Sequence, residues 1–221
     1  CKCQSLDRAV EVCIAVKKKI VPSARVRRMI EDKAEEIRAA VERECTKTNL
    51  EAEVRLNGSV AKDTWIRDYA DVDIFMRVSP KLTKQELRDR CLPVAKKALR
   101  PYPVVERFAE HPYLEAMVDS IRVNIVPCYD TKRGEWLSAT DRTPFHTDYV
   151  KRHLGDQMRG EVRLLKKFMK GTEVYGAEIK IGGFSGYLCE VLILRYKSFA
   201  NTLKAFAQRR QRIVIDVENY Y

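Results

Sequence analysis

The sequence contains no continuous apolar run of about 18 residues, the length that a membrane-spanning helix requires. Its N-terminus, Cys1–Ser5, lacks the apolar segment of a secretory signal peptide. Internal repeats and low-complexity segments are also absent. These absences exclude a membrane-spanning protein and predict a globular chain that has no membrane partner.

Cysteine pairs at metal-ligand spacing are missing as well. The seven cysteines are odd in number and scattered, and the C-x-C pair at the N-terminus has no counterpart elsewhere. A structural zinc site is therefore not expected. Four cysteines lie in segments that are predicted to be structured: Cys45, Cys91, Cys128 and Cys189. We expect free, buried thiols in a reducing cytoplasm.

Positive charge dominates the sequence. The net charge is +11 and the sequence pI is about 9.3, which predicts a polyanionic partner, either nucleic acid or an anionic membrane. The basic residues form four clusters: Lys17–Lys19, Arg25–Arg28, Lys166–Lys170 and Arg209–Arg212. Each cluster alone is consistent with a solvated helix face. Together they favour an RNA or nucleotide footprint.

Hydrophobic periodicity predicts an α+β fold with a mixed sheet. Apolar spacings of three and four indicate a helix over residues 5–20, with Ser5 as a possible N-cap, and another over 26–45. A further helix is predicted over 83–100, which Pro93 must kink or divide. Alternating residues predict the strands 51–56, 71–78, 104–110, 113–118 and 120–126.

A polar loop over residues 129–144 follows the last of these strands. We place a domain boundary there, between a catalytic domain at 1–144 and a mostly helical domain at 145–221. The helical domain is predicted to end in a short strand at 213–217.

Asp71 and Asp73 form the centre of the candidate functional site. Residues i and i+2 of a strand point to the same face, so the two carboxylates lie side by side and repel unless a cation neutralises them. Mg²⁺ accepts one or two carboxylates together with substrate phosphates, and a pair of such ions can clamp a phosphoryl displacement. The alternative is a solvated strand end, because D-x-D is common.

Gly58 and Ser59 precede this pair at a predicted strand-to-helix turn. Glycine permits close backbone approach, and the following N–H groups and hydroxyl can cradle phosphate oxygens. Lys62 adds positive charge one turn later. A strand, Gly-Ser, a short helix and a strand that carries D-x-D form a specific order.

That order resembles the polymerase-β-type nucleotidyltransferase superfamily. More narrowly, the chain is similar to the archaeal class I CCA-adding enzymes over six blocks, which are the segments 58–65, 111–113, 126–129, 141–146, 175–178 and 183–190. The resemblance runs from about residue 20 to the end of the chain.

The resemblance implies a nucleotidyltransferase palm and template-independent transfer of CMP and AMP, from CTP and ATP, to the 3′ end of tRNA by a two-metal mechanism. Asp71 and Asp73 would hold the Mg²⁺ ions, and Gly58, Ser59 and Lys62 would contact the triphosphate. Three residues of the helical domain match positions that face the nucleotide: His146, Lys166 and Tyr175. Each also has a structural alternative, as a hydrogen-bonded histidine, a solvated lysine and a packed tyrosine.

Asn124 departs from the family pattern. The family carries a third carboxylate on a neighbouring strand, and the matching position here bears an amide. An amide oxygen can ligate a metal, but it has no negative charge and cannot take a proton. The alternative function is therefore a nucleotide- or RNA-binding module whose site is weakened or inactive.

The chain is also shorter than the family pattern and does not begin with Met. We expect a fragment, a shortened chain or one half of a split protein, whose partner is a missing C-terminal half or a second copy. Poly(A) polymerases and oligoadenylate synthetases share Gly-Ser and D-x-D, so they remain an alternative substrate class.

Overall fold

The computed structural model describes residues 2–108, 112–178, 180–208 and 214–218, and the chain divides into two compact units. We call them the sheet unit, Ser23–Trp65 with Tyr69–Tyr149, and the helical unit, Cys1–Pro22 with Ile66–Asp68 and Val150–Tyr221. The sheet unit carries the carboxylate pair and is described first.

The sheet unit alternates helices and strands in the predicted order. In chain order its elements are α2 (Ala24–Lys47), β1 (Ala52–Asn57), α3 (Gly58–Ala61), β2 (Asp71–Val78), α4 (Lys84–Ala98), β3 (Val104–Phe108), β4 (Pro112–Val118), β5 (Ile121–Tyr129), the 3-10 turn η1 (Ala139–Asp141) and the first part of α5 (Arg142–His153). The expectation of an α+β fold is confirmed.

The five strands form one mixed sheet in the order β1-β2-β5-β4-β3. β2 and β5 run parallel, and every other neighbouring pair is antiparallel. The parallel pair places the start of β2 beside the start of β5, so Asp71 pairs in register with Arg122 and Asp73 with Asn124. This register fixes which polar side chains meet.

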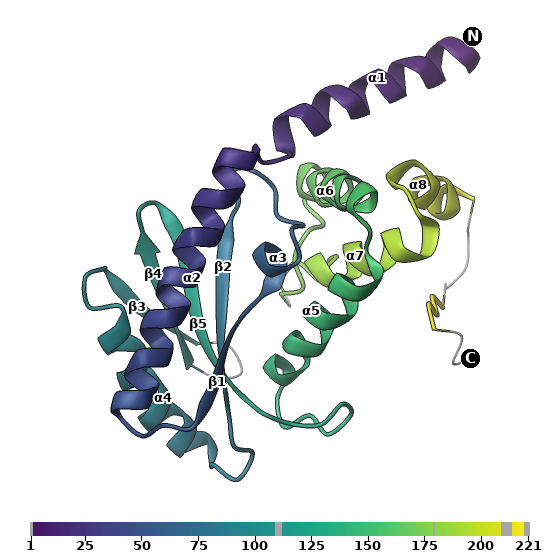
Figure 1. Ribbon diagram of the computed structural model, residues 1–221. Coiled ribbons are helices and arrows are strands. Elements are labelled where there is room, and N and C mark those ends of the chain that lie inside the picture. The colour runs from purple at the N-terminus through teal and green to yellow at the C-terminus, as the bar shows by residue number, and fades with distance from the viewer. Residues whose placement is uncertain (1, 109–111, 179, 209–213, 219–221) are drawn as a thin grey trace. The chain divides into compact units, whose positions relative to one another are not determined.

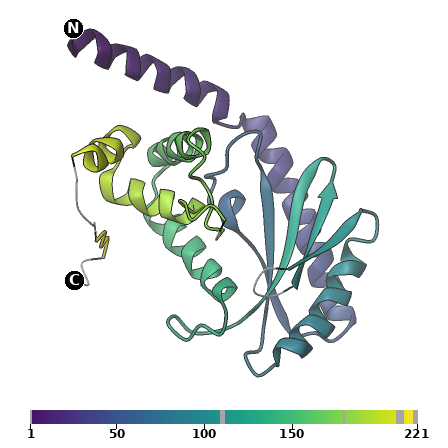
Figure 2. The same ribbon diagram turned by 180° about the vertical axis from the view of Figure 1, so that it is seen from behind.

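One face of the sheet is covered by α2 and α4. Val72, Ile74 and Met76 of β2 are fully buried in the core that these helices complete. Helix α2 lies in front of the sheet in Figure 1 and behind it in Figure 2. Because strand residues alternate between faces, the residues between these three lie on the opposite face, which Figure 2 presents.

The helical unit contains α1 (Lys2–Ile20), α6 (Asp156–Gly171), α7 (Gly186–Tyr196) and α8 (Phe199–Ala207). Ile20, Ile66 and Leu164 form a small core there, and Lys17 pairs with Glu161. No helix in the described part of the chain combines the length and hydropathy needed to cross a bilayer.

Buried Asp141 anchors the loop that precedes α5. Its carboxylate accepts hydrogen bonds from the backbone N–H groups of Tyr129 (2.9 Å), Leu137 (3.0 Å) and Ser138 (2.7 Å). The loop is therefore tied to the end of β5, which fixes where α5 begins.

Several predicted boundaries were wrong. Ser5 is not an N-cap, because α1 begins at Lys2 and Ser5 therefore lies inside the helix. Of the two alternatives for Pro93, the start of a second helix is ruled out, since α4 is one continuous helix with Pro93 on its exposed side. The loop predicted at 129–144 is shorter, because Pro144 lies in the first turn of α5, where a missing N–H costs no hydrogen bond.

The predicted strand at 213–217 is also wrong for the part that can be tested. Ile213 lies outside the described residues, and residues 214–217 form no strand, with the Val214 side chain 81% exposed. The compact units divide within α5, between Tyr149 and Val150, and residues 1–22 belong to the helical unit. The functional domains at 1–144 and 145–221 stay a prediction.

The prediction for the cysteines is confirmed. The four named thiols are free and buried, and burial raises the pKa of Cys45 and Cys189 to about 11 and that of Cys91 to about 12. They contribute to packing rather than to reactivity.

Candidate active site

The carboxylates of Asp71 and Asp73 lie on the face of the sheet opposite α2 and α4. In β2 the residues alternate in burial, with Val72 and Ile74 fully buried on the helix side and the two aspartates partly exposed on the other. The predicted juxtaposition follows directly from this alternation.

Asp73 is enclosed from three directions. Its register partners are Asn57 of β1 and Asn124 of β5, and Nδ2 of Asn124 donates a 2.9 Å hydrogen bond to Oδ1 of Asp73. The second oxygen, Oδ2, lies against Gly58, where a Cβ atom would approach it to 2.1 Å. Gly58 has φ +73°, so glycine serves both the backbone conformation and the close approach.

The electrostatics of this position favour a cation. Burial raises the pKa of Asp73 to about 6; the hydrogen bond from Asn124 opposes the rise, the charge of Asp71 adds to it, and Lys62 opposes it. A divalent ion at the pair would offset the same repulsion.

This pKa leads to a prediction for the metal-free protein. An acid with a raised folded-state pKa contributes stability that is fully present below its ordinary pKa of 3.8 and is lost as the pH rises through about 6. We expect Asp73→Asn to stabilise the chain in EDTA by about 2 kcal/mol more at pH 7 than at pH 4. Urea unfolding at both pH values measures this difference. Asp68→Asn, an exposed control, should show no such pH dependence, and equal differences for both variants would contradict the assignment.

Arg122 is a residue whose importance the sequence did not reveal. Its Nη1 lies 3.6 Å from Oδ1 of Asp71, and its Nε lies 3.9 Å from Oε2 of Glu115. Glu115 is the register partner of Asn124 on β4, and it accepts a 2.9 Å hydrogen bond from Arg107. Arg107, Glu115, Arg122 and Asp71 therefore form a row of alternating positive and negative charges. The only sequence signal was that Arg122 and Asn124 share a strand face.

The Gly58–Ser59 turn is held in place by α5. The backbone N–H of Gly58 lies 3.4 Å from Oγ1 of Thr147, and Lys62, at the end of α3, is buried with 7% exposure. Thr147 follows His146, so the structure brings His146 into the same unit as Asp71 and Asp73. Thr147 is a second residue that sequence reasoning missed.

Lys166 and Tyr175 come together in the helical unit. Lys166 is 3% exposed and its Nζ donates a 3.0 Å hydrogen bond to Glu190, which is fully buried. The hydroxyl of Tyr175 and the ammonium of Lys166 both approach Gly186, and Nζ of Lys170 lies 4.6 Å from the centroid of the Tyr175 ring. Lys166 is thus not the solvated lysine that the alternative assumed.

Two family models match the chain. Residues 35–152 match the nucleotidyltransferase domain, which is more than half of the chain, and residues 160–221 match the second domain of tRNA nucleotidyltransferase. The chain belongs to the nucleotidyltransferase family. Gly58 and Ser59 begin α3, Asp71 and Asp73 lie on β2, and all four residues fall inside the first match.

Curated relatives of this nucleotidyltransferase are named CCA-adding enzyme. The protein of Methanopyrus kandleri is 38% identical over 95% of this chain and 44% of its own length. That of Archaeoglobus fulgidus is 44% identical over 72% of this chain and 36% of its own length. The chain therefore spans less than half the length of these relatives.

Solved structures share the fold at low identity. CdnC of E. coli MS115-1, solved with ATP, has a TM-score of 0.64 and 18% identity over 95% of this chain and 75% of its own. A cytoplasmic RNA terminal U-transferase has a TM-score of 0.58 and 17% identity over 84% of this chain and 50% of its own. These likenesses support the nucleotidyltransferase fold.

Proposed function

We propose that this nucleotidyltransferase adds CMP and AMP, from CTP and ATP, to the 3′ end of tRNA. The observation that carries the proposal is the combination of two matches: a nucleotidyltransferase domain with an intact carboxylate pair, followed by the second domain of tRNA nucleotidyltransferase. The similarity to CCA-adding enzymes over 95% of the chain supports the same substrate.

The residues fit one Mg²⁺ ion. Asp71 and Asp73 offer two hard oxygen ligands on one face, which is the donor set that Mg²⁺ uses together with substrate phosphates. When bound, the ion would stabilise the charge that develops on the phosphate oxygens. A second ion fits poorly, because Asn124 is neutral and turns its N–H toward Asp73.

The remaining residues bind and orient the substrates. Ser59 follows Gly58, which lies against Asp73, and the charge of Lys62 acts on Asp73, so both residues would contact a triphosphate held at the carboxylate pair. His146, Lys166 and Tyr175 remain proposed nucleotide contacts.

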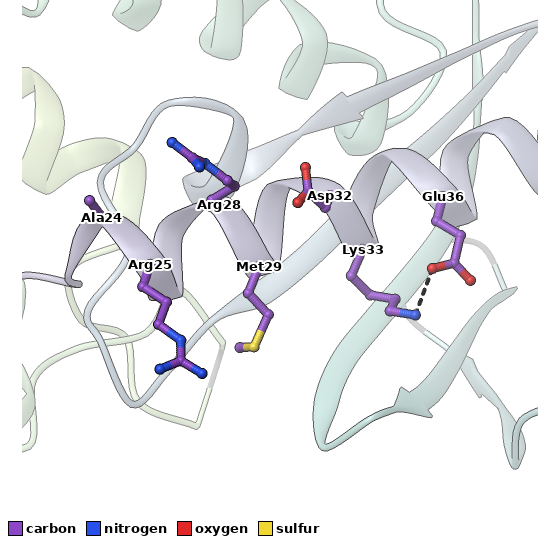
Figure 3. A pocket seen from close by; sticks show the side chains of 7 residues that line it. All are labelled: Ala24, Arg25, Arg28, Met29, Asp32, Lys33 and Glu36. Carbon is purple, nitrogen blue, oxygen red and sulfur yellow. Dashed lines mark hydrogen bonds and ion pairs between the residues drawn. The ribbon is translucent and has the colours of Figure 1, made fainter.

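The tRNA phosphates would meet basic surface on α2. A depression of about 640 Å³ runs along the exposed side of this helix, and Figure 3 shows Arg25, Met29 and Lys33 projecting to one side of the helix and Arg28 to the other. Lys33 is engaged by Glu36 (2.6 Å) and Asp119 (3.1 Å), and Asp32 also lines the depression, so its positive charge comes from the two arginines. Arginine side chains suit phosphate contacts.

The second candidate function is a binding module, which Asn124 favours. A site that holds nucleotide but cannot activate the 3′-hydroxyl would bind RNA or nucleoside triphosphate without turnover.

Labelled-nucleotide incorporation tests the proposal. The chain is incubated with Mg²⁺, CTP or ATP, and tRNA transcripts that end at N73, C74 or C75. We expect CMP on the first two and AMP on the third, and at least about 1,000-fold less with Asp71→Ala and Asp73→Ala combined. An unrelated single-stranded RNA serves as the control substrate and should not be extended.

Four outcomes separate the candidates. Incorporation by the chain itself supports tRNA nucleotidyl transfer. Incorporation only after Asn124→Asp supports the binding module. Equal extension of tRNA and the control RNA contradicts the proposed substrate, and silence of both proteins despite measured nucleotide binding contradicts the proposed activity of this chain.

A further inference from the structure

Arg122 lies on the face of the sheet that carries Asp71 and Asp73. Its positive charge is close to these two carboxylates, whose repulsion a cation would otherwise have to offset. It pairs in register with Asp71 across the parallel strands β2 and β5, and its Nη1 lies 3.6 Å from the carboxylate of Asp71. At 3.6 Å this is a charge contact rather than a bidentate hydrogen bond. The Arg122 side chain is 53% exposed, so its guanidinium can reach a bound substrate.

The position of the guanidinium is set from a second side. Glu115 of β4 lies 3.9 Å from Nε of Arg122 and is itself held by Arg107 at 2.9 Å. Arg122 is thus flanked by one carboxylate on each neighbouring strand. Such an arrangement restricts where a long, flexible side chain places its charge.

The net charge of the site gives a reason why Arg122 and Asn124 occur together. Three carboxylates with two Mg²⁺ ions carry a net charge of +1 before the substrate binds. Asp71 and Asp73 with one Mg²⁺ and one guanidinium carry the same charge, because losing a carboxylate and a divalent ion is balanced by gaining one arginine. Asn124 and Arg122 lie on the same face of β5, two residues apart, so the two changes compensate each other locally.

We propose that Arg122 takes the place of the second divalent ion, so that the chain binds a single ion with its nucleotide. The inference rests on the proposed nucleotidyl transfer and names the residue that completes its site. In that reaction the 3′-oxygen bonds to the α-phosphorus, the bond from the α-phosphorus to the bridging oxygen breaks, and pyrophosphate leaves. The hydroxyl proton passes to water, since neither an amide nor a guanidinium accepts it at neutral pH.

The guanidinium suits this position chemically. It stays charged at every working pH and presents several N–H donors that match phosphate oxygens. Arg122 would contact the α-phosphate or the 3′-oxygen of the tRNA, and would stabilise the negative charge that develops there.

Glu115 offers a competing explanation, because it could supply the third carboxylate from β4 in place of residue 124 on β5. It is the register partner of Asn124, but its two oxygens are turned to Arg107 and Arg122. Within the described ranges no third His, Cys, Asp or Glu side chain joins Asp71 and Asp73 in a metal-binding group. The geometry therefore favours Arg122, and a Glu115 variant separates the two explanations.

Counting bound Mn²⁺ tests the proposal without relying on turnover. The full chain and a non-hydrolysable CTP analogue are mixed at equal concentrations, and electron paramagnetic resonance reports the Mn²⁺ bound per complex. We expect one Mn²⁺ for the chain and for Glu115→Gln, and two for the double variant Arg122→Gln with Asn124→Asp. Two ions in the unaltered chain, one in the double variant, or no nucleotide-dependent Mn²⁺ would overturn the proposal.

Nucleotide affinity provides a second readout with a matched control. Arg122→Gln should raise the Kd of the analogue about tenfold or more, as expected for a lost charge-assisted contact, and Arg122→Lys should restore part of the affinity. Arg88 is similarly exposed, at 47%, and pairs with a glutamate, Glu106, at 3.3 Å, but it lies on α4, so Arg88→Gln should leave the Kd unchanged. Equal effects of both variants would contradict a direct role for Arg122.

The role of Arg122 and the addition of CCA can be contradicted separately. One bound Mn²⁺ with no incorporation into tRNA supports the role of Arg122 and contradicts CCA addition. Incorporation with two bound Mn²⁺ supports CCA addition and contradicts the role of Arg122.

Discussion

Replacing Gly58 by alanine should lower nucleotidyl transfer by about 100-fold, because a methyl group there displaces Asp73. The new Cβ would lie 2.1 Å from Oδ2 of Asp73, well inside van der Waals contact, and the backbone at φ +73° resists an L side chain. Relief requires Asp73 to move, which breaks its 2.9 Å hydrogen bond with Asn124. Initial rates of CMP incorporation, measured with excess tRNA, report the loss.

Gly134 provides a matched control for the backbone. It has φ +93°, yet nothing lies within 4 Å of an added Cβ. Gly134→Ala therefore carries the conformational strain without the clash, and it should retain its transfer rate within about threefold while losing about 1 kcal/mol of stability. Equal loss of activity in both variants would show that backbone strain, and not the position of Asp73, is responsible.

The carboxylate pair could be predicted from sequence because strand geometry is local. The side chains of Asp71, Val72 and Asp73 alternate between the two faces of the strand, and the strand predicted at 71–78 matches β2. The order of helices and strands was equally accessible, since apolar spacing specifies each element separately. These features need no knowledge of the rest of the chain.

The neighbours of the pair were not accessible in the same way. That Asp73 meets Asn124, and Asp71 meets Arg122, depends on the register between β2 and β5, which are separated by α4 and a β-hairpin. Register is set by packing over the whole sheet rather than by either strand alone. Thr147 was missed for the same reason, because its contact with Gly58 joins residues far apart in the sequence.

Lys166 shows the other limit of sequence reasoning. A lysine in a basic helical segment is predicted to be exposed. Lys166 instead lies on the buried side of α6, and its partner, Glu190, belongs to α7. Only the tertiary pairing of two helices reveals that its charge is neutralised. Its assignment as a nucleotide contact stays a prediction, and stability measurements can separate the two roles.

Lys166→Met should lower the free energy of unfolding by about 3–5 kcal/mol, the cost of leaving a buried charge without its partner. Glu190 is fully buried and Lys166 is 3% exposed, so water cannot compensate for the lost 3.0 Å hydrogen bond. Urea unfolding followed by circular dichroism measures the loss. Lys167→Met, at the next and exposed position of the same helix, should change stability by less than about 0.5 kcal/mol.

A double variant identifies the cause of the loss. Lys166→Met combined with Glu190→Leu removes both charges, and it should recover most of the stability, because an apolar pair of similar volume fits a buried site at least as well. If the double variant is no more stable than Lys166→Met, the destabilisation comes from packing and not from the unpaired carboxylate. If Lys166→Met instead keeps its stability and only raises the KM for CTP, the ammonium acts on the nucleotide, and the buried pair is secondary to that contact.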